Sequence, residues 1–241
     1  MDGMNVCVRR LRCVTAMALL LAIWIFPAHA GPPSSSASET ALERELQSLL
    51  ADHALASSDA HALVRLADLY LDLGDAYPEE AKRRAAYEEG ARLAQRAIAI
   101  DASNADAHYL YAANLGSATQ LKGTMASALT INDLKAHVRQ ALGLKPDHAR
   151  ALHMMGMMLE ELPWFLGGDR TAALIYLQQA VAADPHYTHA RLDLAKIYMK
   201  RRNTEAARKE LATIVSAAPS SDHRHQRYRE EARQLLHSID H

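Results

Sequence analysis

The chain has 241 residues, 49% of them hydrophobic, and its 27 basic and 28 acidic side chains give a net charge of −1. A near-neutral chain lacks the strong positive charge by which nucleic acids and anionic membrane surfaces are bound, so we expect neither as a partner. The chain contains only 10 glycines and shows no alternating β-branched runs, and this pattern favours an all-α fold.

The N-terminal 30 residues have the pattern of a secretory signal peptide. Arginines at positions 9, 10 and 12 precede an apolar run over residues 14–26, and an A-x-A exit ends at Ala30. The run is short for a membrane span. We therefore predict cleavage after Ala30, a periplasmic mature chain and no stable membrane span after cleavage. The only cysteines, Cys7 and Cys13, would leave with the signal. Residues 31–38, rich in Gly, Pro and Ser, form a predicted flexible linker.

Helical signals begin after this linker. Thr40 and Glu43 form a capping box for a helix through about Ala56, and Asp59 is placed to cap the next helix. From there one pattern of two helices recurs over residues 59–102, 103–146, 147–185 and 186–219. An amphipathic helix over residues 222–240, with a charged outer face, suits a C-terminal cap.

The last repeat shows the pattern most clearly. Leu194 and Tyr198, four residues apart, share one side of its first helix. Ala195 on that helix and Ala207 on the second are small, so the two helices can approach closely. Thr204 is the predicted N-cap of the second helix. This spacing is that of the tetratricopeptide repeat. The chain is therefore predicted to be a tetratricopeptide-like right-handed helical solenoid of about four repeats, with capping helices at both ends.

The repeats differ in the separation of their two small positions. The separation is 12 residues in the last repeat, and 17, 22 and 23 in the third, second and first. In a solenoid the turns within repeats lie along one edge, and insertions there often mark a binding face. We expect a thickened wall along this edge, built from residues 75–86, 120–131 and 162–168.

Two stretches carry a more specific resemblance. YAANLGSATQLKG (residues 111–123) and the segment over residues 161–200 resemble a subset of tetratricopeptide proteins. That subset includes the periplasmic TatT component associated with TRAP transporters and the eukaryotic regulator-of-microtubule-dynamics proteins. The resemblance to TatT implies a periplasmic accessory of a TRAP transporter that contacts a solute-binding protein, with a homo-oligomer as one assembly. From the repeat pattern we predict a non-enzymatic scaffold in the bacterial cell envelope that binds a protein or peptide.

No catalytic motif stands out, and we predict neither an enzyme nor a cofactor. The mature chain has 12 of the 13 histidines. The pairs His186/His189 and His223/His225 suggest metal binding, but we identify no acidic or cysteine ligand beside them at metal spacing. We therefore predict no metal site.

The most unusual segment, residues 162–169, contains Trp164 and Phe165, the only Trp and Phe of the mature chain. These aromatic side chains either fill the space that the insertion opens or form a lip at a binding groove. Acidic residues on the free faces of the first helices come early in the chain, and basic ones come late. The sequence predicts one concave site for an acidic peptide or ligand, bordered by Tyr109, Arg150, His153, Met157, Trp164 and Lys196. The alternative function is a small-ligand carrier whose pocket the insertions close, and an enclosed apolar pocket near Trp164 would favour it.

Overall fold

The computed structural model describes residues 36–51, 58–218 and 223–240. Within these ranges it contains helices and no strand, so the predicted all-α class is confirmed. The elements are α1 (Ser36–Ala51), α2 (Ala60–Ala76), α3 (Glu80–Ile100), α4 (Ala105–Leu121), α5 (Thr124–Leu144), α6 (Ala149–Glu161), the 3₁₀ helix η2 (Trp164–Leu166), α7 (Arg170–Ala183), α8 (Thr188–Lys200), α9 (Thr204–Ser216) and α10 (His223–Asp240).

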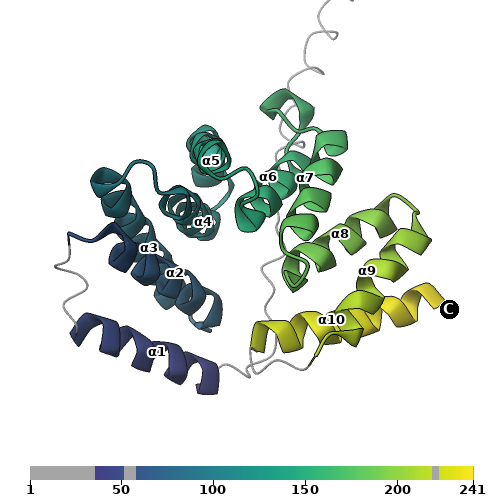
Figure 1. Cartoon of the computed structure of the whole chain (residues 1–241), viewed down its shortest axis with the longest axis horizontal. Helices are drawn as coiled ribbons and strands as arrows, with labels where there is room; N and C mark the ends of the chain where they lie inside the picture. Colours follow the sequence, from purple (N-terminus) through teal and green to yellow (C-terminus); the bar gives the residue numbers. More distant parts are fainter. Residues whose placement is uncertain (1–35, 52–57, 219–222, 241) are drawn as a thin grey trace, which may run out of the picture.

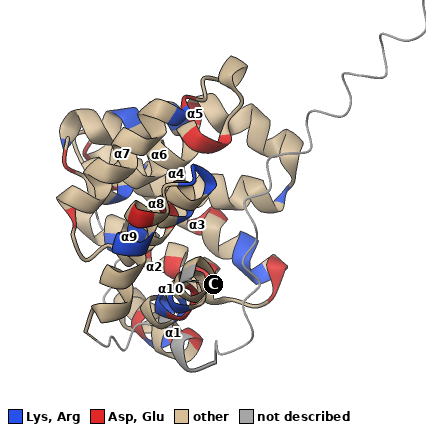
Figure 2. Cartoon of the chain, turned by 90° about the vertical axis from the view of Figure 1, so that its right-hand side faces the viewer, with Lys and Arg blue, Asp and Glu red and all other residues tan. Residues whose placement is uncertain are grey.

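The helices form a helical repeat solenoid, as predicted. Figure 1 shows them in an arc that runs from α1 to α10. Consecutive helices pack as pairs, α2 with α3, α4 with α5, α6 with α7 and α8 with α9, and α2 and α6 also contact α4. The first helices of the first three repeats thus approach one another, while α10 packs on both α8 and α9. Figure 2 gives the same fold from the side of α10, with the charged residues coloured.

Small residues at the pattern positions allow the helices to pack closely. Ala67, Ala112, Ala195 and Ala207 have no exposed surface. A Cβ on Gly156 of α6 would lie 2.7 Å from Leu177 Cγ and 3.1 Å from the Ala173 carbonyl on α7. The neighbouring helix α7 therefore leaves no room for a side chain at position 156.

The insertions within the repeats form additional helical turns rather than long loops. α3 and α5 each have 21 residues, against 14 for α7 and 13 for α9. Of the predicted wall, residues 80–86 belong to α3 and residues 124–131 to α5. The third insertion differs, because Pro163, η2 and two glycines connect α6 to α7.

Side-chain caps explain where several helices begin. Asp59 accepts a hydrogen bond from the His61 amide at 2.9 Å, as predicted. Asp169 accepts hydrogen bonds from the amides of Thr171 and Ala172 at 2.9 and 3.0 Å at the start of α7. The predicted cap at Thr204 is wrong. Asn203 is the N-cap of α9, and its side-chain oxygen accepts from the Ala206 amide at 3.2 Å.

The predicted signal peptide and most of the predicted linker lie outside the described residues. α1 begins at Ser36 and is described to Ala51, whereas the sequence suggested a helix from Thr40 to about Ala56. Among the described helices, none combines the length and apolar character that crossing a membrane requires.

Candidate functional site

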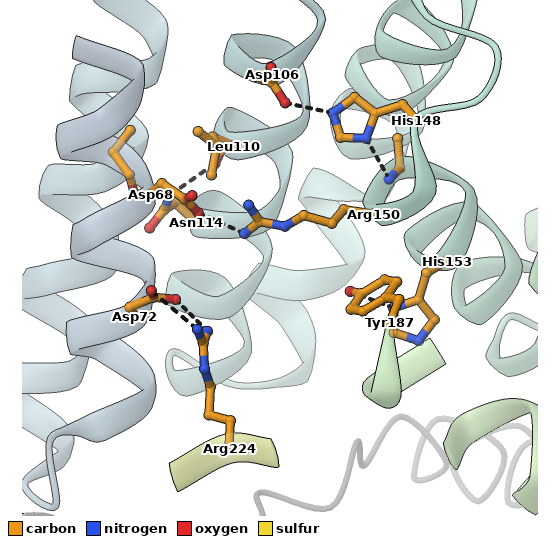
Figure 3. A network of polar contacts seen from close by, with 12 residues as sticks. Asp68, Asp72, Asp106, Leu110, Asn114, His148, Arg150, His153, Tyr187 and Arg224 are labelled. Atoms are coloured by element: carbon orange, nitrogen blue, oxygen red, sulfur yellow. Dashed lines mark hydrogen bonds and ion pairs between the residues drawn. The ribbon is translucent and has the colours of Figure 1, made fainter. Parts of the chain in front are cut away.

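The inner side of the arc carries a network of charged and aromatic side chains. Arg150, near the start of α6, donates a hydrogen bond through Nη2 to Asp68 Oδ1 on α2 at 2.7 Å. Its guanidinium carbon also lies 4.7 Å from the ring centre of Tyr109 on α4. Figure 3 shows this arginine extending between the helices. One side chain therefore connects three first helices.

The C-terminal helix takes part in the same network. Arg224 of α10 reaches across to α2, where Nη1 and Nη2 donate to the two carboxylate oxygens of Asp72 at 2.5 and 3.3 Å (Figure 3). Burial raises the pKa of Asp72 to about 6, although Arg224 opposes this shift. Lys196 of α8 pairs with Glu231 of α10 at 2.7 Å. Acidic residues from the first part of the chain, such as Asp72, are thus partly neutralised by basic residues from the last part, such as Arg224.

A cluster of histidines lies where α6 faces α8. His153 Nε2 is 2.9 Å from Asp193 Oδ2, and His153 Nδ1 is 3.2 Å from the Tyr187 hydroxyl. His189 Nε2 approaches the same Asp193 oxygen at 3.3 Å. The ring of His189 stacks on Tyr228 of α10, with ring centres 4.7 Å apart. Two imidazoles therefore face a single carboxylate oxygen.

The structure brings four of the six predicted site residues into this inner network, namely Tyr109, Arg150, His153 and Lys196. Met157 instead packs against Leu177, Leu194 and Ile197 between helices. Trp164 follows the opposite end of α6, and its ring contact is with Phe165 at 5.9 Å. Trp164 is 85% exposed, so the interpretation in which it fills a gap in the core is wrong.

Two features of this region were not predicted from the sequence. His189 and Asp193 are four residues apart on α8, a spacing that places both on one helix face, yet the acidic partner was overlooked. Tyr187, which contacts His153, was not singled out. Outside this region, the side chains of Met125 and Leu129 on the first turns of α5 are 72% and 78% exposed, which was also not predicted.

Similarity to known proteins agrees with this architecture. Residues 34–161, more than half of the chain, match the family described as regulator of microtubule dynamics protein 1-3. The chain belongs to this family. Residues 166–228 match a tetratricopeptide repeat family. A crystal structure of TTC0263, a thermophilic tetratricopeptide protein of Thermus thermophilus, has a similar fold, with a TM-score of 0.58 and 17% identity over 84% of this chain and 89% of that one.

The chain is similar to mammalian members of the regulator-of-microtubule-dynamics family. It is 30% identical over 198 residues to regulator of microtubule dynamics protein 1 of Bos taurus, covering 75% of this chain and 62% of that protein. The same protein of Pongo abelii is 30% identical, and the match covers 63% of this chain and 54% of that protein. The same protein of Mus musculus is 27% identical, and the match covers 75% of this chain and 64% of that protein. The chain thus spans between 54% and 64% of these relatives' length.

These relatives correct the predicted location. The periplasmic location is wrong, because the relatives are proteins of mammals, whose cells have no periplasm. The resemblance to tetratricopeptide proteins and to regulators of microtubule dynamics is supported, whereas these comparisons give no support to the TatT part of the resemblance. The accessory role beside a TRAP transporter required an exported chain, and it is given up with that location.

Proposed function

We propose that this family member is a non-enzymatic scaffold that binds a partner protein through an aromatic rim, defined as Trp164, Phe165 and Leu166. The tetratricopeptide fold suggests protein interaction in general terms. The observation that carries the more specific proposal is the exposure of the three side chains, which is 85%, 62% and 41%. Clustered exposed aromatic groups are typical of the residues that dominate the binding energy of an interface.

The backbone beneath the rim is held in a defined shape. Lys135 of α5 is a buried residue, and its ammonium group donates to the carbonyls of Leu166 and Gly167 at 3.4 and 3.0 Å. The Gly168 amide donates to the Pro163 carbonyl at 3.0 Å. Gly167 has φ +79°, a conformation that a side chain disfavours. A partner therefore meets the rim with little further loss of backbone entropy.

The inner network is less suited than the aromatic rim to bind a partner, because its charged side chains are already paired. Arg150 is paired with Asp68, and Lys196 is paired with Glu231. A peptide that used these charges would have to replace contacts already made within the chain, which reduces the net gain. The prediction that a partner lies between Tyr109, Arg150, His153 and Lys196 therefore remains a second mode of binding, one that requires rearrangement of α10.

The exposure of Trp164 also bears on the small-ligand alternative. That function called for an enclosed apolar pocket beside this residue, whereas 85% of its surface is open to solvent. An open aromatic edge suits a protein surface better than a small molecule, which needs most of its own surface buried. We therefore prefer the scaffold function.

Site-specific photo-crosslinking tests the proposal. A photoreactive amino acid at Phe165 should capture a defined protein in extract from the source cells, and the additional substitution Trp164→Ala should abolish that capture. The matched control is a photoreactive group at Ile175, which is 51% exposed but lies on α7. Identical products from both positions would contradict a binding site at the rim.

The names of the relatives supply a first candidate partner. Because they are called regulators of microtubule dynamics, polymerised tubulin is the protein to test first by co-sedimentation. Wild type and Ile175→Ala should co-sediment equally if microtubules are the partner, and Trp164→Ala should remain in the supernatant. Absence of the wild type from the pellet would exclude microtubules but would leave the crosslinking test of the rim unaffected.

A further inference from the structure

Three groups able to bind a metal converge where α6 meets α8. They are His153 of α6, together with His189 and Asp193 of α8, and one donor atom from each lies within 4.8 Å of the other two. Among the residues that the structure describes, no other three His, Cys, Asp or Glu side chains bring their donor atoms this close together. We propose that it is a binding site for a divalent transition-metal ion of the zinc type, which goes beyond the scaffold function.

The donor separations suit a small tetrahedral ion. Zinc binds imidazole nitrogen and carboxylate oxygen at about 2.0–2.2 Å, which places neighbouring ligands about 3.3 Å apart. Asp193 Oδ2 lies 2.9 Å from His153 Nε2 and 3.3 Å from His189 Nε2. The two imidazole nitrogens, at most 4.8 Å apart, approach further by a small rotation of the partly exposed His189. The ion would take the place of the Nε2 protons that point at the carboxylate, and each neutral imidazole would carry its proton on Nδ1 instead, where the Tyr187 hydroxyl can accept a hydrogen bond from His153.

The protonation state at neutral pH is the one that a metal requires. The rings of His153 and Tyr228 pack against the His189 imidazole, and this desolvation lowers the pKa of His189 to about 4, so the imidazole is neutral although the edge of the side chain reaches solvent. Burial alone would raise the pKa of Asp193, but the hydrogen bond from His153 and the positive groups nearby outweigh it and leave the pKa well below its usual value. Neutral imidazole and ionised carboxylate are the ligand forms.

Surrounding contacts hold the ligand side chains in place. The Tyr187 hydroxyl lies 3.2 Å from His153 Nδ1, and Tyr228 stacks on the His189 ring. Contacts of this kind to the far side of a ligand fix its orientation and strengthen metal binding. The His189 side chain is 41% exposed, whereas His153 and Asp193 are 8% and 13% exposed. Solvent can therefore reach the remaining coordination position, which leaves room for a bound water.

Two positive side chains near His189, Lys196 and Arg227, oppose cation binding. Lys196 Nζ lies 3.8 Å from Asp193 Oδ1, but it lies closer, at 2.7 Å, to Glu231. Asp193, Glu231 and Lys196 together carry a charge of −1 before any metal binds, and the guanidinium of Arg227, which also acts on His189, opposes this negative charge. Two imidazoles and a carboxylate favour zinc and similar ions over magnesium or calcium, which prefer oxygen ligands throughout.

Calorimetric titration with zinc chloride tests the site in the full chain after removal of bound metal by a chelator. Wild type should show one binding event that His189→Ala weakens by about tenfold or more. The control is His186→Ala, which removes an exposed histidine three residues away and should bind like the wild type. Cys7 and Cys13 are present in all three proteins, so zinc held by them gives no difference. Equal binding by the three proteins, or no binding by the wild type, would overturn the proposal.

A second measurement covers the case in which His189→Ala fails to fold. Zinc should raise the Tm of the wild type and of His186→Ala, because a ligand of the folded state stabilises it. Asp193→Asn keeps the size of the side chain and should lose this increase. The same increase in Asp193→Asn as in the wild type would refute the site.

Discussion

Gly90 should be among the positions least tolerant of an added methyl group. It lies on α3, facing Asn114 of α4, which has no exposed surface. The Asn114 amide nitrogen donates to the Ala67 carbonyl of α2 at 3.1 Å and to the Leu110 carbonyl at 3.0 Å. This single amide therefore connects helices from two successive repeats. A Cβ at position 90 would contact Asn114 Oδ1 and lie 2.6 Å from its Cγ.

The cost of Gly90→Ala follows from these distances. Carbon atoms in contact prefer about 3.5–4.0 Å, so the buried amide must move by roughly 1 Å. Overpacking of this kind costs about 1–3 kcal/mol. Displacing the amide from the Ala67 carbonyl loses that hydrogen bond, at a further cost of about 0.5–1.5 kcal/mol. The higher helix propensity of alanine offsets about 1 kcal/mol. The expected net loss of stability is about 0.5–3.5 kcal/mol.

Urea unfolding followed by circular dichroism measures this loss. Gly143→Ala is the matched control, because Gly143 also lies in a helix and a Cβ there meets nothing within 4 Å. The control should gain about 1 kcal/mol from helix propensity alone. In an Asn114→Ala background, Gly90→Ala should cost less, since the clashing amide is gone. A Gly90→Ala midpoint equal to or above that of Gly143→Ala would refute the packing argument.

Two further predictions concern α8. Ala195→Leu should lower the free energy of unfolding by about 1–3 kcal/mol, because Ala195 is fully buried against Leu211. The control is Ala212→Leu, which changes an exposed residue of α9 and should leave the urea midpoint nearly unchanged. Equal urea midpoints for Ala195→Leu and Ala212→Leu would contradict the proposed contact. For His189, burial lowers the folded pKa to about 4, against about 6.5 in the unfolded chain. Its contribution to stability is therefore full above about pH 6.5 and falls as the pH decreases toward about 4. Thermal unfolding in a chelator at pH 7 and pH 5 should show a smaller loss for His189→Gln than for wild type, and equal losses would show that His189 does not titrate in this way.

Local sequence signals predicted much of the fold. Asp59 was identified as a helix cap because a cap depends only on a side chain and the next few amides. The repeat pattern located Ala195 and Ala207 in the core for a similar reason, since a spacing of three or four residues defines a helix face. Thr204 and Asn203 are adjacent and both can cap, so sequence alone did not separate them.

The candidate site depended on contacts that no local pattern specifies. The spacing of His189 and Asp193 can be read from the chain, but their partner His153 lies on another helix, 36 residues earlier than His189. Trp164 was recognised as unusual, yet its exposure depends on whether another element packs over it. Arg224 and Asp72 are separated by 152 residues, and their contact required the arc to bring α10 back to α2.

The sequence by itself determined the helical class, the repeated pairs and their small contact positions, because short-range periodicity and steric size govern these features. It also determined the signs of the charges along the chain. The tertiary structure decided which charges neutralise each other, which aromatic side chains meet solvent, and which histidines share a carboxylate. Each of these depends on the curvature of the whole stack, to which the small offsets between successive helix pairs all contribute.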